Sequence, residues 1–239
     1  MLLFAAAVAD DLALLASLHD REPTRDIIEA ARRAPMSEQL GIVLHSSKGR
    51  DALAAFARMI DTLPAAIDDE VLDDLAAGFT EVYLRHSYRA APTESVWMTE
   101  DGLERQAPMF QVRDWYRRAN LRVTDWASRP DDHLVLQLLF VAHVMKVARG
   151  ADDMRRAARF LDEHLLRWVH RFAESLIQTE APDWYAALAL LTACYVDEVR
   201  DHLTEITGQQ RPSGDQVAGK ERSVDGAEVP YLPGVAPSW

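Results

Sequence analysis

The stretch DDHLVLQLLFVAHVMKVAR, residues 131–149, decides the fold class. Its apolar residues follow one another too closely to leave a continuous polar face, so they surround the helix that their spacing predicts. A helix that is apolar all round has to be covered by other elements. We therefore expect this segment to be the central helix of the protein.

On both sides of this segment, apolar residues recur at steps of three and four positions, which is typical of amphipathic helices. Alternation of the kind that strands show is scarce. Prolines, glycines and capping residues divide the helices, which we predict up to Asp20 and over residues 24–33, 37–45, 109–119, 151–175 and 182–207, with two more that Ser47 and Asp68 cap. The predicted fold class is all-α, a single-domain multi-helix bundle.

The first nine residues are apolar and end in Ala7-Val8-Ala9, which is similar to a signal-peptidase site. No Lys or Arg precedes them and two acids follow, whereas a signal peptide has a basic start and a longer apolar stretch. We expect instead a first helix whose leucines face the core: Leu2, Leu3, Leu12, Leu14, Leu15 and Leu18. No continuous apolar stretch reaches about 18 residues, so no transmembrane helix or integral membrane association is predicted.

Two regions lack a helical pattern. Residues 86–108 contain Pro92, Gly102 and Pro108 with polar residues between them, and predict a long loop before the central helices. Long loops inside compact domains are usually functional. From residue 208 on, glycines and prolines are frequent and no apolar period remains. We expect a helical domain over residues 1–207 and a flexible tail over residues 208–239.

The charge and the cysteine content limit the classes of function. The chain has 26 basic and 38 acidic residues and a net charge of -12, which disfavours nucleic acid and favours a basic peptide as partner. Cys194 is the single cysteine, so one chain can form neither a disulfide nor a cysteine-based metal cluster. It lies in an apolar run, where we expect it to be buried. This usage is typical of the cytoplasm.

The chain contains no complete catalytic motif. A His-Glu-x-x-His pair, a Gly-x-Ser-x-Gly elbow, a phosphate loop and a dinucleotide fingerprint are all missing from the sequence. His19-Asp20 and Asp201-His202 are similar to parts of metal-dependent phosphohydrolase signatures, but the other ligands do not follow in order. We assign no catalytic residue and no metal ligand, and keep a helical metal-dependent hydrolase as an alternative.

Two short segments stand out from this background. The first, APTESVW at residues 91–97, lies in the predicted long loop, and the second, RPDDH at residues 129–133, opens the central helix. Pro130 suits a helix start, and Asp131 or Asp132 can accept the free backbone N–H groups there. His133 would then exchange a proton near neutral pH beside the carboxylates. Taken alone, the second segment fits a helix cap with an incidental histidine better than a binding site.

Together with a third segment, these motifs resemble the TorD/DmsD chaperone family. Its members carry Pro-x-x-Ser-x-aromatic, then Glu-Pro-x-Asp-His before an apolar helix, then Phe-Leu-x-x-His-Leu-x-x-Trp. The corresponding segments here are Pro92-Thr-Glu-Ser95-Val-Trp97, Pro130-Asp131-Asp132-His133 and Phe160-Leu161-Asp-Glu-His164-Leu165-Leu166-Arg-Trp168. The resemblance covers roughly residues 12–203. Arg129 stands where the family usually has Glu, and Thr93 stands where an aromatic residue often follows the proline.

The resemblance implies a cytoplasmic chaperone and no enzyme or cofactor. Such a chaperone binds the twin-arginine leader, and often the body, of an apo molybdenum-cofactor oxidoreductase and holds it for cofactor insertion before export. The implied leader-binding residues are Pro92, Ser95, Trp97, Pro130, Asp132 and His133. Val96, Trp115 and Tyr116 could add apolar and aromatic wall to a groove, with burial in the core as the alternative, which fits Trp115 equally well.

Other questions stay open at this stage. A helical interaction protein with a different client is a second alternative. The client, any bound nucleotide, the role of the tail and the choice between monomer and homodimer do not follow from the sequence. Residues 91–108 and 120–130 could act as hinges for helix exchange between two copies.

Overall fold

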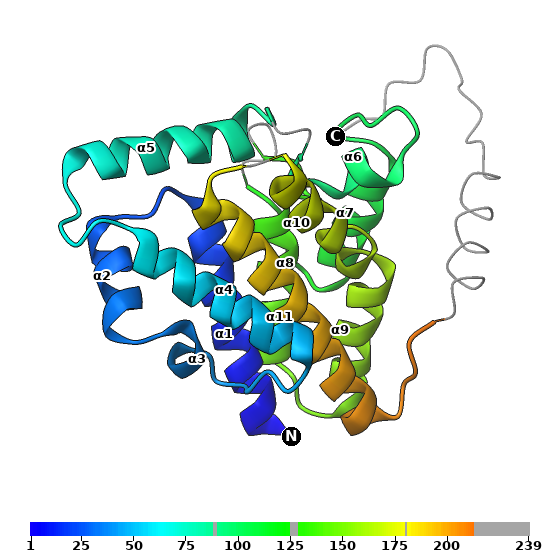
Figure 1. Ribbon diagram of the computed structural model, residues 1–239. Helices are drawn as coiled ribbons and strands as arrows, with labels where there is room; N and C mark the ends of the chain where they lie inside the picture. The colour runs from blue at the N-terminus through cyan, green and yellow to red at the C-terminus, as the bar shows by residue number, and fades with distance from the viewer. Residues whose placement is uncertain (88–89, 125–128, 180, 213–239) are drawn as a thin grey trace, which may run out of the picture. The chain divides into compact units, whose positions relative to one another are not determined.

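The computed structural model describes residues 1–87, 90–124, 129–179 and 181–212 (Figure 1). The helices are α1 (Leu2–Asp20), α2 (Arg25–Arg33), α3 (Met36–Gln39), α4 (Ser47–Thr62), α5 (Asp69–Phe79), the π-helical turn η1 (Thr80–Leu84), α6 (Glu94–Met98), α7 (Ala107–Arg118), α8 (Leu134–Lys146), α9 (Ala151–Glu163), the 3-10 turn η2 (Leu165–Arg167), α10 (Val169–Gln178) and α11 (Asp183–Thr207). No strand occurs in the described ranges, where one isolated β-bridge joins Thr93 to His133. The predicted all-α class is confirmed.

Side-chain caps mark the starts of several helices, as expected. The Thr24 side chain accepts a hydrogen bond from the backbone N–H of Ile27, and Asp68 accepts one from that of Val71. At α4 the capping residue is Ser46 and not the predicted Ser47. The last helix, α11, ends at Gly208, whose φ of 70° is the left-handed conformation that glycine adopts at helix ends.

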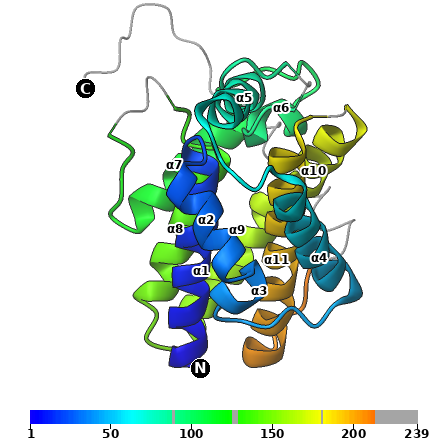
Figure 2. The ribbon, with the colours of Figure 1, turned by 60° about the vertical axis from the view of Figure 1, so that its left-hand side comes forward.

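Helices α8, α1 and α11 form the centre of the bundle. The apolar α8 packs against α1 on one side and α9 on another, while α11 packs against α4, α9 and α10 (Figures 1 and 2). The predicted central helix is therefore central, although it starts at Leu134 and not at the predicted residue 131. Cys194 of α11 is buried, as expected.

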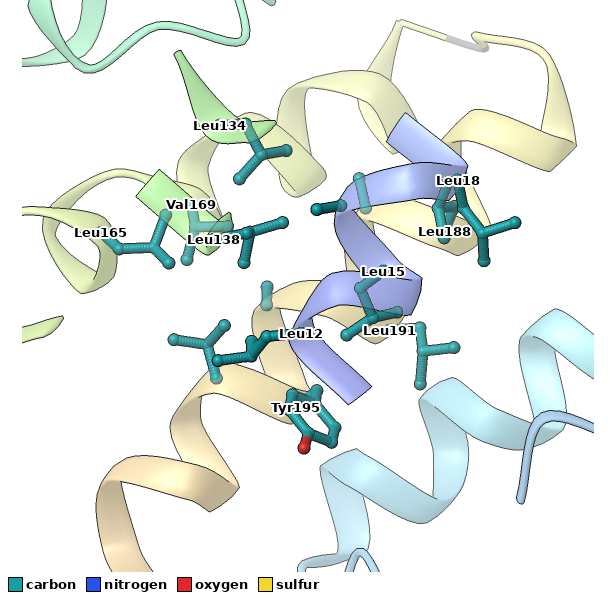
Figure 3. Close-up of a cluster of buried hydrophobic side chains, with 14 of the residues drawn as sticks. Leu12, Leu15, Leu18, Leu134, Leu138, Leu165, Val169, Leu188, Leu191 and Tyr195 are labelled. Carbon is teal, nitrogen blue, oxygen red and sulfur yellow. The ribbon is translucent and has the colours of Figure 1, made fainter. Parts of the chain in front are cut away.

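Leucines from distant parts of the chain meet in the core (Figure 3). Leu12 and Leu15 of α1 lie beside α11, and Leu138 of α8 lies near Val169 of α10. All four are at most 1% exposed. At about 25 cal/mol per Å² of apolar surface, such burial is the main favourable contribution to folding.

The first turn of α1 corrects the expectation for the leading leucines. Leu2 and Leu3 are 55% and 88% exposed, and Leu14 is half-buried. Leu12, Leu15 and Leu18 are buried as predicted. An 18-residue window of this 19-residue helix has a mean hydropathy of 1.6, so the helix is long and apolar enough to cross a membrane by length and composition alone. Half of that window is buried within the protein, and a buried core helix passes the same test.

The helix predicted over residues 37–45 is also wrong. Helix α3 has four residues, and Leu40 is already extended. The Asp11 carboxylate of α1 accepts hydrogen bonds from the backbone N–H groups of Gly41 at 2.7 Å and Ile42 at 3.2 Å. Because these donors bond to a distant carboxylate, the chain leaves the helical path after Gln39.

The helix predicted over residues 151–175 is interrupted at His164, whose φ of -131° and ψ of -86° are not helical. The chain forms α9, then the turn η2, and restarts as α10. The ring of His164 is fixed by a contact with Glu94, described below. A contact with a residue in another helix thus breaks a segment whose local pattern is continuous.

The predicted loop over residues 86–108 is largely a packed segment that contains α6. Residues 90–95 are all buried. All the helices belong to one compact unit, Met1–Gln209. The domain bounds of 1–207 and 208–239 stay a prediction, and the predicted flexible tail lies, from residue 213 on, outside the described residues.

Candidate functional site

The first two motifs lie side by side. The backbone N–H of Leu134 donates to the carbonyl of Pro92 at 2.8 Å, and that of Glu94 donates to the carbonyl of Asp132 at 3.1 Å. These bonds form the bridge between Thr93 and His133. The start of α6 is thereby joined to the start of α8, so the bundle brings together residues that the sequence separates.

The Asp132 carboxylate anchors α6. Its Oδ2 accepts hydrogen bonds from the backbone N–H of Ser95 at 2.8 Å and from the Ser95 hydroxyl at 2.5 Å. Ser95 Oγ in turn accepts from the backbone N–H of Gln106 at 3.2 Å. Burial, with a smaller contribution from the neighbouring Glu94, raises the pKa of Asp132 to about 6 against the lowering effect of the Ser95 bonds.

Glu94 is a second, fully buried carboxylate of this cluster. Its Oε2 accepts from Nε2 of Gln137 at 2.8 Å, and Nδ1 of His164 lies 3.0 Å from its Oε1. Gln137 also donates to the carbonyl of Asp132 at 3.1 Å. The cluster thus joins α6, α8 and the break after α9.

Sequence reasoning did not assign Glu94, Gln137 and His164 to the site. Two of them stood inside the quoted motifs, Glu94 between Pro92 and Ser95 and His164 in the third motif. No signal in the sequence pointed to Gln137, which looks like one polar residue on an apolar helix.

His133 is the residue that caps α8. Its Nδ1 accepts from the backbone N–H of Val135 at 3.2 Å, so the expected cap by Asp131 or Asp132 is wrong. Burial, with a smaller effect of Arg129, lowers the pKa of His133 well below its usual value. The ring is therefore neutral near pH 7, and the expected titration near neutral pH does not occur. Asp131 instead pairs with Arg113 at 2.6 Å.

The six predicted leader-binding residues differ in exposure. Pro92, Ser95, Pro130, Asp132 and His133 are buried, and Trp97 is half-buried. Nε1 of Trp97 donates to the carbonyl of Ala91 at 2.8 Å, and the Arg171 guanidinium lies 5.3 Å from the centre of the Trp97 ring. Trp97 is the one of the six whose side chain reaches the surface.

The groove wall predicted from Trp115 and Tyr116 is wrong for both. Trp115 is 9% and Tyr116 4% exposed, and their rings pack against Phe140 of α8. Leu103, after α6, and Phe110, in the first turn of α7, offer surface instead, since they are 56% and 53% exposed.

Arg129, where the family pattern has Glu, makes an ion pair. Its Nη1 lies 2.5 Å from Oδ1 of Asp20 at the end of α1. His19, next to Asp20, is buried, with its ring nitrogens on the hydroxyls of Tyr83 and Thr192. Both residues of the His19-Asp20 pair therefore have structural partners. Among the described residues, no group of three or more His, Cys, Asp and Glu is arranged to hold a metal ion.

Comparison with known proteins agrees with the motifs. The family model described as nitrate reductase delta subunit matches residues 47–174. Proteins named chaperone protein TorD and a probable Tat proofreading chaperone DmsD also match. The chain belongs to the TorD/DmsD family.

The TorD proteins match over different lengths. TorD of Vibrio cholerae is 31% identical over 144 residues, which are 56% of this chain and 64% of that protein. TorD of Vibrio vulnificus is 24% identical over 193 residues, 77% of this chain and 89% of that protein. DmsD of Haemophilus influenzae is 29% identical over 101 residues, 42% of this chain and 47% of that protein. The matched part of this TorD/DmsD protein thus spans just under two thirds of the Vibrio cholerae relative.

Proposed function

We propose that this protein is a cytoplasmic chaperone of molybdoenzyme maturation. It binds the twin-arginine leader, and often the body, of an apo oxidoreductase and holds it for cofactor insertion before export. One observation carries the proposal: the family's motifs meet in a single buried cluster directly behind the half-buried Trp97. The names of the TorD and DmsD relatives support the same class of function.

In this proposal the buried residues position the site. Pro92, Ser95, Pro130, Asp132 and His133 hold the start of α6 against α8 through the bridge and the Asp132–Ser95 hydrogen bonds. A rigid support of this kind lowers the entropic cost of binding. Trp97 at the surface of α6 makes the direct contact with the leader, with Val96 beside it.

The surface beyond α6 suits the chemistry of a twin-arginine leader. Glu100 and Asp101 are exposed and can pair with guanidinium groups, which favour carboxylates in bidentate geometry. Leu103 and Phe110 offer exposed apolar area to the apolar stretch of the leader. Acidic and apolar side chains thus lie on the segment after α6 and the first turn of α7, which the bond from Gln106 to Ser95 joins to the buried cluster.

The alternatives make different predictions. A metal-dependent hydrolase would bind a stoichiometric metal ion, while His19 and Asp20 are already engaged with protein groups. An interaction protein with another client would bind its client but no leader. We propose that the protein has no catalytic activity of its own.

Calorimetric titration with a panel of twin-arginine leaders from molybdenum oxidoreductases tests the proposal. We expect one leader to bind, and we expect Trp97→Ala to weaken it roughly 30-fold, as for an interface anchor of about 2 kcal/mol. Phe4 is a half-buried aromatic residue near the N-terminal end of α1. The variant Phe4→Ala is therefore the matched control and should bind the leader normally. A panel without any binder contradicts leader recognition, and equal affinity of the Trp97 variant contradicts the site.

A further inference from the structure

The basic residues of this acidic chain are concentrated in one stretch of the sequence. Residues 105–171 hold 13 of the 26 basic residues but only 8 of the 38 acidic ones. Many of these basic residues are exposed on the C-terminal half of α7 and on or just before α9. We call six of them the basic face: Arg117, Arg118, Arg149, Arg155, Arg156 and Arg159.

Ion pairs neutralise half of the basic face. Arg117 pairs with Asp114 at 3.4 Å, Arg155 with Asp152 at 2.6 Å and Arg156 with Asp153 at 3.1 Å. The other three, Arg118, Arg149 and Arg159, have no carboxylate partner among the residues that the structure describes. What distinguishes them from other exposed arginines is that they lie next to the three paired arginines, on or near the same two helices.

Arg159 is held in place without a carboxylate. Its guanidinium lies 5.7 Å from the centre of the Trp115 ring, which joins α9 to α7. Arg118 follows Trp115 by three residues, which places it on the same side of α7. Trp115 also packs edge-on against His164 of the buried cluster, with 6.4 Å between ring centres. The basic face therefore borders the support of the candidate site.

We propose that the basic face is a second docking surface, which binds a short Asp/Glu-rich segment of a partner protein. The planar guanidinium matches a carboxylate with two parallel hydrogen bonds, and the ring beneath Arg159 limits the side-chain entropy lost on binding. Arg118, Arg149 and Arg159, which pair with no carboxylate of the described residues, can accept such a segment while the existing pairs stay intact.

The net charge favours a short acidic peptide over a larger polyanion. Charges interact over a screening length of about 8 Å at physiological ionic strength. A short segment experiences mainly the basic face, whereas a DNA duplex or an anionic membrane extends over the acidic remainder of the protein and is repelled. We therefore choose an acidic protein segment as the occupant.

This surface is distinct from the leader site and opposite to it in sign. The leader is basic and is proposed to meet the acids after α6, while the basic face takes an acidic part of a partner. The inference does not require the proposed function to hold, because the two surfaces can be titrated separately.

The test uses the full chain and a fluorescein-labelled peptide of roughly ten residues that alternates Glu and Ala. A Gln-Ala peptide of the same length is the neutral control. The variant Arg118→Glu/Arg159→Glu reverses two free arginines. The matched control, Arg33→Glu/Arg58→Glu, changes the net charge equally at exposed arginines of α2 and α4. Circular dichroism verifies that both variants fold.

We expect the Glu-Ala peptide to bind and the Gln-Ala peptide not to bind. Reversing Arg118 and Arg159 should weaken binding roughly tenfold or more, while the matched control should change it less than about twofold. The leader affinity of both variants, measured in parallel, should stay near that of the wild type. Equal binding of the neutral peptide, or equal losses in both variants, overturns the proposal. Tighter binding of duplex DNA or of phosphatidylglycerol vesicles than of the peptide overturns the choice of partner.

Discussion

The carboxylate of Glu94 lies 3.0 Å from Nδ1 of His164, and both side chains are at most 3% exposed. One residue starts α6, and the other interrupts the path from α9 to α10. Because Glu94 also accepts from Gln137 of α8, this contact joins three parts of the bundle behind Trp97. Two residues of the family's motifs therefore owe their positions to each other.

The first prediction concerns this pair. His164→Ala leaves the buried Glu94 with Gln137 alone and should lower the free energy of unfolding by ~3–5 kcal/mol in urea denaturation. Glu94→Gln keeps a side-chain oxygen that can face the His164 ring, so it should lower the free energy of unfolding by less. A loss below about 1 kcal/mol for His164→Ala would show that the pair contributes little.

The second prediction concerns the pH dependence that Asp132 causes. Its folded pKa of about 6 lies above the ordinary value of 3.8, so the folded protein holds this proton more tightly than the unfolded chain. The stabilisation is complete below pH 3.8 and is lost as the pH rises through 6. From well below pH 3.8 to well above pH 6, the wild type should lose about 3 kcal/mol relative to Asp132→Asn.

Denaturation of both proteins from pH 4 to pH 8 measures this difference, in which the other titrating groups cancel. A difference that does not change with pH would mean that burial leaves the Asp132 carboxyl unperturbed.

The third prediction concerns a buried ion pair outside the site. Nε and Nη2 of Arg200 in α11 each lie 2.8 Å from an oxygen of Asp162 in α9. Arg200→Met leaves a buried carboxylate without this partner and should cost ~3–5 kcal/mol, whereas Arg200→Met/Asp162→Leu should recover most of the loss. The exposed ion pair between Arg117 and Asp114 gives the control. Arg117→Met should lower the free energy of unfolding by no more than about 1 kcal/mol. Equal effects of the two single changes would contradict a special role of burial.

The fourth prediction concerns Ser95 as a positioning residue. Ser95→Ala removes the hydroxyl that donates to Asp132 and accepts from Gln106. We expect leader affinity to fall roughly fivefold or more, because one hydrogen bond to a charged group contributes about 1.5–3 kcal/mol and α6 is less firmly held. Ser17→Ala removes an exposed hydroxyl of α1 and serves as the control. Unchanged leader affinity of Ser95→Ala, in a folded variant, would separate α6 from leader binding.

Local signals in the sequence predicted most helix ends, and long-range contacts explain the failures. Thr24, Asp68 and Gly208 cap their helices through contacts within a few residues, so the residue type alone predicts the helix end. The break at His164 depends on Glu94, and the short α3 depends on Asp11. Neither partner is near in sequence.

The sequence predicted several residues of the candidate site but not how they are arranged or buried. The motifs brought Ser95, Asp132 and His133 to attention, but their spacing could not tell that all three are buried. His133 is a neutral cap because its ring is buried, which lowers its pKa. Of the six predicted residues, Trp97 is the one that reaches the surface, and its motif did not set it apart from the others.

Hydrogen exchange of the protein with and without its leader peptide tests the central claim most directly. The account predicts slower exchange over residues 94–106, which include α6 and the acidic segment after it, and little change in α4 and α11. Slower exchange in α4 or α11 with none over residues 94–106 would contradict the proposed site.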